Sequence, residues 1–503
     1  MSNIVSINHR LVRGCSAMAL AAGLFAAAPA LAQPAQDLVI GMPVASVANL
    51  DPHGATTNVQ GILQVNAQIF EPLVNFVDGE YVPALATEWS ANEDATRWTI
   101  KLREGVSFSD GSSLDAEDVR ASMQRVVELA GPLAGLFKPL SIEIVSPSEL
   151  VISSEVGQGA LLGKLFMLAI APSEKLGDDF GLNPVGTGPF VVDAFDPSQG
   201  VTLKANPGYW RGAPKLDSVT FRMIPEQAAR TTALETGEIQ LTWTLPDDQV
   251  APLSENPDLV VDTVTTMANI VLWFNSDRPA FEDVEVRRAL WSAIDFDTII
   301  EALYPNTGSK MEGPLPATVF GASKQTPYVY DAEAARAVLE AKGWDFDGTT
   351  VGVLMNNTTY KPLVDALLAD WARIGVKGEV DLQEPAVGTK RLLDLDWDIA
   401  IVQPVITNTG DADYNLGRLY TCAANRTTYC DETLDALLTE AGAISDQARR
   451  AELYAQAGKI IWDNAVGMFP MDVKQVWAWS AALEGVRLDA VYKPDLTQIH
   501  FTK

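Results

Sequence analysis

The first half of the chain alternates apolar and polar positions in short runs, and this pattern predicts β-strands. Residues 98–102 and 219–222 are clear examples, because every second side chain in them is apolar. Gly and Pro residues separate such runs, as at positions 186–189, and they mark turns. We therefore expect a strand-rich region from Asp37 to about Thr266, interrupted by a helix over Ser113 to Val127 with Asp115 as its N-cap.

The second half repeats apolar positions three and four residues apart, which predicts amphipathic helices. Asp and Ser cap helix N-termini, and Pro suits the first turn of a helix. On these grounds, four helices are expected to begin at Asp331, Pro362, Asp431 and Ser445. Apolar runs at residues 350–354 and 398–402 lie between helices and predict buried strands. Helices that alternate with strands indicate an α/β layer structure.

Residues 1–32 have the composition of a secretory signal peptide. Arg10 and Arg13 give a positive start, and a small apolar stretch follows that is too short for a membrane span of about 20 residues. The A-x-A pattern that ends at Ala32 predicts cleavage before Gln33. We therefore expect a soluble, exported protein, located most simply in a bacterial periplasm.

The composition narrows the class of partner. With 36 Lys and Arg against 65 Asp and Glu, the formal net charge is −29, which repels nucleic acid and anionic lipid headgroups. We expect no nucleic-acid partner and no insertion into a membrane. Cys422 and Cys430 lie eight residues apart in a polar loop, and an oxidising compartment favours a disulfide between them, with two free thiols as the alternative.

The chain carries no recognisable catalytic or metal-binding motif. It contains 3 His and 3 Cys, with neither C-x-x-C nor H-E-x-x-H spacing, so a metal site lacks its usual ligands. There is no G-x-S-x-G turn, and residues 158–164 do not fit a phosphate-binding P-loop. We expect no enzyme, no cofactor and no metal. A hydrolase that uses a pair of carboxylates stays open as an alternative, since spacing along the chain does not reveal such a pair.

The better candidates for binding chemistry are aromatic side chains. The chain has 12 Trp residues, and several stand beside polar residues in predicted loops. Those singled out are Trp210, Trp243, Trp477 and Trp479. Binding clefts combine aromatic walls with a few polar groups, although a Trp is more often part of a core.

Several ordered segments resemble one protein family. They include residues 50–52 (LDP), 69–74 (IFEPLV), 102–111 (LREGVSFSDG), 116–119, 184–190 (PVGTGPF), 206–210 (NPGYW) and 283–295. In this order they are similar to the family 5 extracellular solute-binding proteins, the peptide, nickel and opine receptors of ABC importers. The resemblance runs from about Asp37 to the C-terminus.

The resemblance implies a two-lobed periplasmic binding protein fold of type II, in the large peptide-receptor variant. Lobe I is expected over residues 37–268 with an extra subdomain at about 60–184, lobe II over 269–479, and a return to lobe I over 480–503. Crossing segments near Met267–Ile270 and Trp477–Leu483 are expected to form the hinge. A ligand would then bind by closure of the lobes around it.

The ligand site is predicted where the chain departs from the family pattern. Peptide-binding members carry a Trp and an Asp in lobe II, where Val405 and Asn408 stand here. Dipeptide-binding members carry an Arg in a segment that here contains only Lys361 as a cation. The predicted ligand-binding residues are Asn408, Asp411, Tyr414, Trp243, Asn356, Tyr360 and Lys361. Amide and hydroxyl groups dominate, which favours a modified peptide or a ligand with many neutral hydrogen-bonding groups.

We therefore predict a monomeric binding component of an ABC importer that captures a peptide, or a peptide-like or opine-like conjugate, and delivers it to a membrane permease. An oligosaccharide ligand is an alternative within the same fold, and nickel or haem is disfavoured by the scarcity of His and Cys. A ligand sensor that presents its closed form to a chemoreceptor is a further alternative.

Overall fold

The structure is a computed structural model that describes residues 35–55, 60–401 and 404–502. The described residues belong to one unit, Ala35–Thr502, and only this unit is considered below. The predicted signal peptide lies outside the described residues. Within them, none of the helices has the length and apolar character that a bilayer crossing requires.

Strands dominate the first half of the chain, and helices dominate the second. The first half contains β1 (Asp37–Met42), α1 (Gln60–Ile69), β2 (Val74–Val77), β3 (Glu80–Pro83), β4 (Ala86–Ala91), β5 (Arg97–Leu102), α2 (Ala116–Glu128), α3 (Ala134–Phe137), β6 (Ser141–Ser146), β7 (Glu149–Ser153), α4 (Leu161–Met167), η1 (Ser173–Lys175), β8 (Phe190–Asp196), β9 (Gly200–Ala205), β10 (Ser218–Met223), α5 (Gln227–Glu235), β11 (Leu241–Trp243) and α6 (Asp247–Ser254). The second half contains β12 (Leu259–Phe274), η2 (Pro279–Phe281), α7 (Val284–Ser292), α8 (Phe296–Leu303), β13 (Gly308–Lys310), α9 (Ala332–Ala341), β14 (Thr350–Met355), α10 (Lys361–Arg373), β15 (Lys377–Leu382), α11 (Pro385–Leu393), β16 (Ile399–Ala400), β17 (Val405–Ile406), α12 (Ala412–Leu419), α13 (Glu432–Ala443), α14 (Gln447–Asp463), β18 (Gly467–Ser480), β19 (Leu483–Glu484) and β20 (His500–Phe501). This confirms the predicted α/β class.

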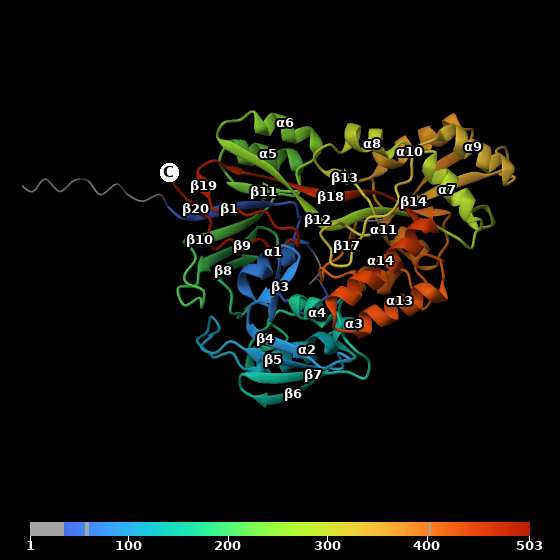
Figure 1. Cartoon of the computed structure of the whole chain (residues 1–503). Coiled ribbons are helices and arrows are strands. Elements are labelled where there is room, and N and C mark those ends of the chain that lie inside the picture. Colours follow the sequence, from blue (N-terminus) through green and yellow to red (C-terminus); the bar gives the residue numbers. More distant parts are fainter. Residues whose placement is uncertain (1–34, 56–59, 402–403, 503) are drawn as a thin grey trace, which may run out of the picture. The chain divides into compact units, whose positions relative to one another are not determined.

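One mixed sheet runs through both lobes. Its strand order is β15-β14-β16-β12-β18-β11-β1-β10-β9-β8, with β13 and β17 attached at β18 and β12 (Figure 1). β12 and β18 are long antiparallel neighbours at its middle, paired from Leu259 opposite Ser480 to Trp273 opposite Gly467. Their register shifts between Thr265 and Asn269, which marks an irregularity at the centre of the pair.

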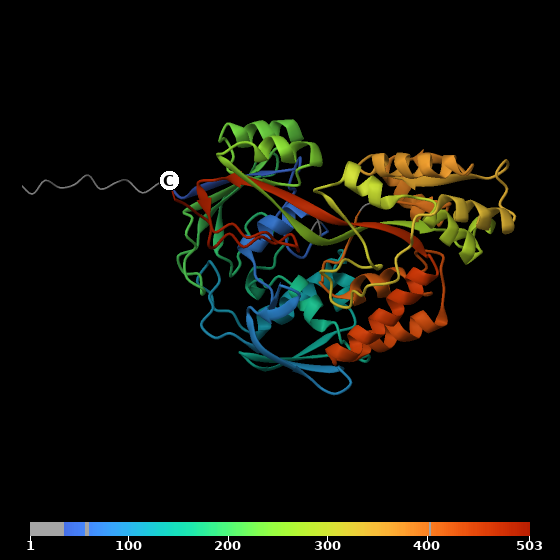
Figure 2. The same cartoon turned by 45° about the horizontal axis from the view of Figure 1, so that its top comes forward.

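β18 changes its second neighbour at the same level. Residues 471–473 pair with β13, whereas residues 477–479 pair with β11. The two long strands therefore join the β14–β16 side of the sheet to the β11–β1 side. Figure 2 shows β12 and β18 running side by side between the helices α5 and α6 on one side and the helices α8 to α10 on the other.

The two faces of β18 are buried in different cores. Val476 and Ala478 pack with residues of α5 and α6, including Leu234 and Leu253. Trp477 belongs to the core that also contains residues of α1, β1 and β10. This alternation is the period of two expected for a strand that is covered on both faces.

A second, four-stranded antiparallel sheet has the order β4-β5-β7-β6. Helix α2 lies beside it in Figure 1 and contacts β6. Asp115 starts this helix with a capping box, since its side chain accepts the N–H of Glu117 while Asp118 accepts the N–H of Asp115. The helix thus begins at Ala116, later than the predicted Ser113, because the cap residue Asp115 itself has an extended backbone.

Most of the other helices begin at the residues that the predicted caps indicated. Asp331 and Asp431 cap α9 and α13, and Pro362 lies in the first turn of α10. Ser445 does not cap α14; Asp446 does, because its carboxylate accepts the N–H of Arg449. The predicted strand at residues 398–402 is shorter, with β16 covering Ile399–Ala400.

Cys422 and Cys430 are joined by a disulfide in the loop between α12 and α13. The loop is also held by the side chain of Asp435, which accepts the N–H of Cys422 at 2.9 Å. The disulfide closes a short loop in the unfolded chain, so it stabilises the fold mainly through loss of chain entropy.

Replacing both cysteines by serine should lower the free energy of unfolding by about 2–3 kcal/mol, since the closed loop is short. Urea unfolding of the double variant and of wild type, each with and without reductant, measures this. Reduced wild type should match the double variant. An unchanged unfolding midpoint in both would contradict the stabilising role.

Candidate functional site

A cavity of about 410 Å³ lies in the first lobe. Its walls come from α1, from β2, from the end of α4 and from the segment 489–498 near the C-terminus. These pieces are far apart in the sequence, so the fold alone assembles the cavity. Its size is within the range of about 300–1,000 Å³ that small-molecule sites occupy.

The apolar part of the wall includes Leu63, Phe70, Phe76, Phe166 and Met167. The rings of Phe76 and Phe166 lie 6.2 Å apart between centroids. Asn66, Lys493 and several acidic residues bring polar groups to the same wall. The cavity thus combines an aromatic surface with a few polar groups, as ligand sites do.

Glu71 is a buried acid in this wall whose hydrogen bonds are all directed into the protein. Its carboxylate accepts the hydroxyls of Thr187 and Tyr209, each at 2.8 Å, and the indole N–H of Trp210 at 2.7 Å. Burial raises the pKa of Glu71, and these donors act in the opposite direction. Glu71 therefore holds the wall together. Trp210, one of the aromatic candidates, serves this structural role.

None of the seven predicted ligand-binding residues lines this cavity. Asp411 is only 1% exposed at its side chain and pairs with the equally buried Arg450, Nη2 to Oδ1, at 2.9 Å. The same carboxylate accepts the N–H of Asp413 and caps α12. Burial raises the pKa of Asp411, against the pull of Arg450. The carboxylate of Asp411 therefore makes its contacts inside the second lobe.

Arg450 makes further hydrogen bonds in that lobe. Its Nε donates to the carbonyl of Ala441 at 2.9 Å, and Nη2 donates to the hydroxyl of Tyr454 at 3.0 Å. The guanidinium therefore links the start of α12, the end of α13 and the body of α14. Asp411 Oδ2 has no hydrogen-bond partner among the described residues.

Lys361 lies on the surface of α10 and is already paired. Its ammonium lies 2.6 Å from Asp365 Oδ2, one helical turn along, and both side chains are partly exposed. The neighbouring Asn356 is buried and accepts an N–H from Asn357 at 2.9 Å. Tyr360 lies with its ring 6.2 Å from Tyr304, and burial raises its pKa.

The remaining predicted residues lie elsewhere in the fold. Trp243 is fully buried, and its ring centroid is 5.1 Å from that of Trp477 across β11 and β18. Its indole N–H has no partner among the described residues. Asn408 is half-buried and lies in the turn before α12. Tyr414 lies on α12, and the guanidinium carbon of Arg418 is 4.8 Å from the centroid of its ring. Asp411 and Tyr414 lie close together at the start of α12, where the backbone N–H of Tyr414 donates to the carbonyl of Asp411 at 3.1 Å.

The backbone of the loop before α4 is in direct contact with the backbone at the end of α13. Gly159 N–H donates to the carbonyl of Gly442 at 2.7 Å. A Cβ on Gly159 would lie 1.9 Å from the carbonyl oxygen of Ile444, and one on Gly157 would lie 2.0 Å from that of Ala443. Neither of the two loop glycines has a positive φ. The contact itself, and not the backbone conformation, therefore requires glycine at both positions.

A second contact joins the same two parts of the chain. The hydroxyl of Tyr81, on β3, donates to the carbonyl of Thr409 at 2.6 Å. A Cβ on Gly163 of α4 would lie 2.7 Å from this hydroxyl. The segments that receive these contacts, residues 409–411 and 441–444, are the ones that Arg450 holds.

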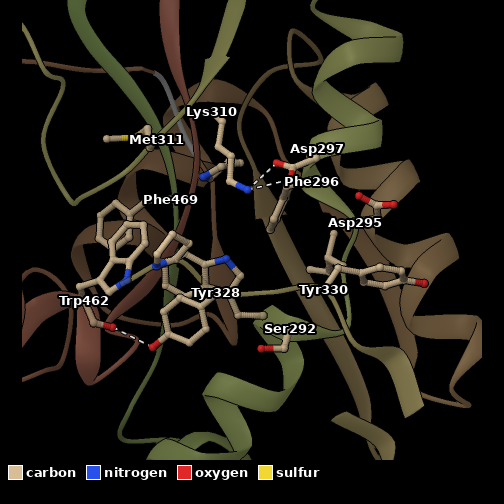
Figure 3. A pocket seen from close by; sticks show the side chains of 14 residues that line it. Ser292, Asp295, Phe296, Asp297, Lys310, Met311, Tyr328, Tyr330, Trp462 and Phe469 are labelled. Atoms are coloured by element: carbon tan, nitrogen blue, oxygen red, sulfur yellow. Dashed lines mark hydrogen bonds and ion pairs between the residues drawn. The ribbon is translucent and has the colours of Figure 1, made fainter. Parts of the chain in front are cut away.

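A pocket in the second lobe is too small to hold a solute. Figure 3 shows its aromatic wall with Tyr328, Trp462 and Phe469 and, above them, Lys310 bonded to Asp297. Its volume is about 40 Å³, little more than the share of one water molecule. The ring of Tyr328 stacks on the ring of Trp291 with 4.0 Å between the centroids, so each ring covers one face of the other. This pocket is a packing feature.

No group of three or more His, Cys, Asp or Glu side chains suited to a metal ion occurs within residues 35–55, 60–401 and 404–502.

Comparisons with known proteins agree on one family. The sequence model described as "Bacterial extracellular solute-binding proteins, family 5 Middle" matches residues 80–427. The chain is 27% identical over 494 residues to the glutathione-binding protein GsiB of Shigella boydii, which covers 94% of this chain and 95% of the relative.

Two solved structures with bound ligands are also similar. The periplasmic binding protein DppA from Helicobacter pylori, in complex with the peptide STSA, is 25% identical with a TM-score of 0.77 and covers 93% of this chain and 98% of its own. MoaA from A. tumefacien R10, in complex with mannopinic acid, is 25% identical with a TM-score of 0.76 and covers 93% and 100%. The likeness therefore extends along nearly the whole chain.

Replacing Asp411 by Asn should lower the free energy of unfolding by about 3–5 kcal/mol, because it leaves the charge of Arg450 buried without a partner. Asp365→Asn, which breaks the exposed pair with Lys361, is the matched control and should change it by about 1 kcal/mol or less. Urea unfolding of both variants measures the difference. Equal effects would contradict the central role of the buried pair.

Proposed function

The chain belongs to family 5 of the bacterial extracellular solute-binding proteins, the binding components of ABC importers, and from that membership we propose that it captures a peptide or a peptide-like amino-acid conjugate. The observation that carries this proposal is the likeness to the glutathione-binding protein over 94% of the chain. Glutathione is itself a modified peptide.

The bound ligands of the other relatives support the same class. One relative holds a tetrapeptide, and the other holds mannopinic acid, an opine-type compound. Both kinds of ligand carry carboxylate and amine or amide groups. The ordinary zwitterionic dipeptide is disfavoured here, because Asp411 is committed to Arg450 and Lys361 to Asp365.

We further propose export to the periplasm and delivery of the ligand to a membrane permease by a monomer. The family description, the disulfide between Cys422 and Cys430, and the signal-like residues 1–32 support export. The relatives are binding proteins, which supports the absence of catalysis.

Closure of the lobes on the ligand is part of the proposal. We assign the hinge to the irregular pairing near Thr265–Asn269 and to the facing residues 472–475, where β18 changes its second neighbour. The contacts of Gly159 and Tyr81 with the second lobe would form on closure. Hinge closure of this kind is typical of periplasmic receptors.

A thermal-shift screen of the refolded protein without residues 1–32 tests the ligand class. The panel contains glutathione, di- to pentapeptides, opines, oligosaccharides and nickel. A ligand at 100 times its dissociation constant stabilises the fold by about 2.7 kcal/mol, which raises the melting temperature visibly. We expect a shift with glutathione-like or opine-like compounds.

The other outcomes separate the alternatives. A shift with oligosaccharides alone would replace the peptide-like ligand within the same fold. Turnover of a chromogenic ester or glycoside would contradict the binding role and favour a hydrolase. Uptake that survives deletion of the permease genes would favour a sensor over an importer component.

Gly159→Ala should weaken binding of the ligand found in this screen by about tenfold, because its methyl group prevents the closing contact and lowers the closed fraction. Small-angle X-ray scattering of the ligand-saturated variant should give a larger radius than wild type. Gly135→Ala is the control, since a Cβ there meets nothing within 4 Å. Equal affinity and radius for Gly159→Ala and wild type would contradict the closing role of this contact.

A further inference from the structure

Two neighbouring buried side chains at the middle of the β12–β18 pair each keep an oxygen atom without a hydrogen-bond partner. Asn269 on β12 and Asp472 on β18 are direct partners in the antiparallel register. They are 2% and 7% exposed, and the Oδ1 atom of each has no partner among the described residues. Opposite residues of this kind project to the same face with their Cβ atoms about 5 Å apart, so one hydrogen bond can join the two side chains.

A proton on Asp472 would satisfy both oxygen atoms at once. A carboxylate and an amide oxygen only accept hydrogen bonds, whereas a protonated carboxyl group has one O–H to donate. Native proteins leave few buried polar atoms unpaired. With its proton, Asp472 can donate to Asn269 Oδ1 across the two strands.

The surroundings of Asp472 favour this protonated form. The carboxyl group forms no ion pair within the described part of the chain. Burial raises the pKa of Asp472 to about 7, against a hydrogen bond from the backbone of Ala317 and the positive charge of Lys474. The negative charge of Glu312 adds to the rise. Asp472 is therefore a group that gains or loses its proton near neutral pH.

The strands on either side of this pair bring no titratable side chain to the same level. The residue paired with Asp472 on β13 is Ser309, and the residue paired with Asn269 on β17 is Val405. Lys474, two residues further along β18, and Glu312, in the segment after β13, are the charged groups that act on the carboxyl group. Asp472 is the titratable member of this row across the sheet.

We propose that the protonated Asp472 donates a hydrogen bond to Asn269 and that this bond is a pH-dependent link between the two crossing strands. When the proton leaves to the solvent, a buried carboxylate lies beside a second acceptor, and β12 and β18 are held together less firmly. The link lies in the irregular stretch of their pairing, to which the hinge is assigned above. A pH-dependent firmness of the hinge rests on the proposed function, whereas the link itself does not.

Urea unfolding of wild type and Asp472→Asn between about pH 5 and pH 8 tests the proton. An Asp titrates near about 4 in the unfolded chain and Asp472 near about 7 in the fold, so unfolding releases a proton between these values. Stability from this group is thus present at low pH and is lost as the pH rises. The unfolding constant of wild type, divided by that of Asp472→Asn, should rise about tenfold per pH unit and level off above about pH 7.

Asp394→Asn is the matched control for this comparison. Asp394 is exposed at the end of α11 and paired with Lys390, so the corresponding ratio for this variant should stay nearly constant over the same pH range. A ratio for Asp472→Asn that is equally constant would overturn the inference.

A double-mutant cycle of Asn269→Leu and Asp472→Leu tests the partner. At about pH 5.5 the two substitutions should be coupled by about fivefold in the unfolding constant, since each removes the same hydrogen bond. At about pH 8 the coupling should disappear. A coupling that persists at pH 8 would overturn the inference, because the amide of Asn269 would then donate to the carboxylate without any proton on Asp472.

Hydrogen exchange locates the effect and needs wild type alone. After correction for the intrinsic exchange rates, the amides of residues 267–272 and 468–473 should lose about tenfold in protection between pH 6 and pH 8. Should Asp472→Asn fail to fold, this measurement decides, and unchanged protection overturns the link. None of these results bears on the ligand class. Failure of every compound in the thermal-shift screen would remove the role of the link in a hinge and leave the link itself standing.

Discussion

The buried ion pair between Arg450 and Asp411 is the interaction on which the facing surfaces of the two lobes depend. Asp411 starts α12, and the same guanidinium holds the carbonyl of Ala441 near the end of α13. A buried pair of this kind gives specificity of position more than net stability, because desolvation of both charges offsets their attraction. Here the position matters, since Gly159 and Tyr81 contact the backbone of the two segments that the pair holds.

The contact of the Gly159 loop with the end of α13 depends on the absence of a side chain at Gly159. Gly159 N–H reaches the carbonyl of Gly442 at 2.7 Å, and a Cβ on Gly159 would overlap with Ile444. Such a contact forms at one separation of the lobes and at no other, because backbone groups do not adapt as long side chains do. It therefore distinguishes a closed arrangement from a nearly closed one more sharply than a surface salt bridge does.

The sequence predicts those parts of the fold that depend on near neighbours. Asp331 and Asp431 start helices because a cap acts on the next two or three residues, and the prediction at Ser445 misses by one residue because a second capping residue stands beside it. The ligand site depends on contacts between distant residues, which a single sequence does not contain. Asp411 looks available in sequence, yet its partner stands 39 residues later.

The same reason separates the two lysines. Lys361 is predicted to bind the ligand, but Asp365 one turn later pairs with it, and that i,i+4 spacing is readable from sequence. Lys493 gives no such signal, because Phe166 and Asn66 reach its cavity only through the fold.

One peptide group of β12, that of Met267, hydrogen-bonds two distant segments of the chain. The N–H of Met267 donates to the carbonyl of Ala490 at 3.3 Å, and its carbonyl accepts the N–H of Thr407 at 2.8 Å. Ala490 lies three residues before Lys493, and Thr407 lies directly before Asn408. Met267 falls within the irregular stretch of the β12–β18 pair. The segment that leads to Lys493 and the turn that leads to Asp411 are therefore joined through one peptide group in the irregular stretch of β12.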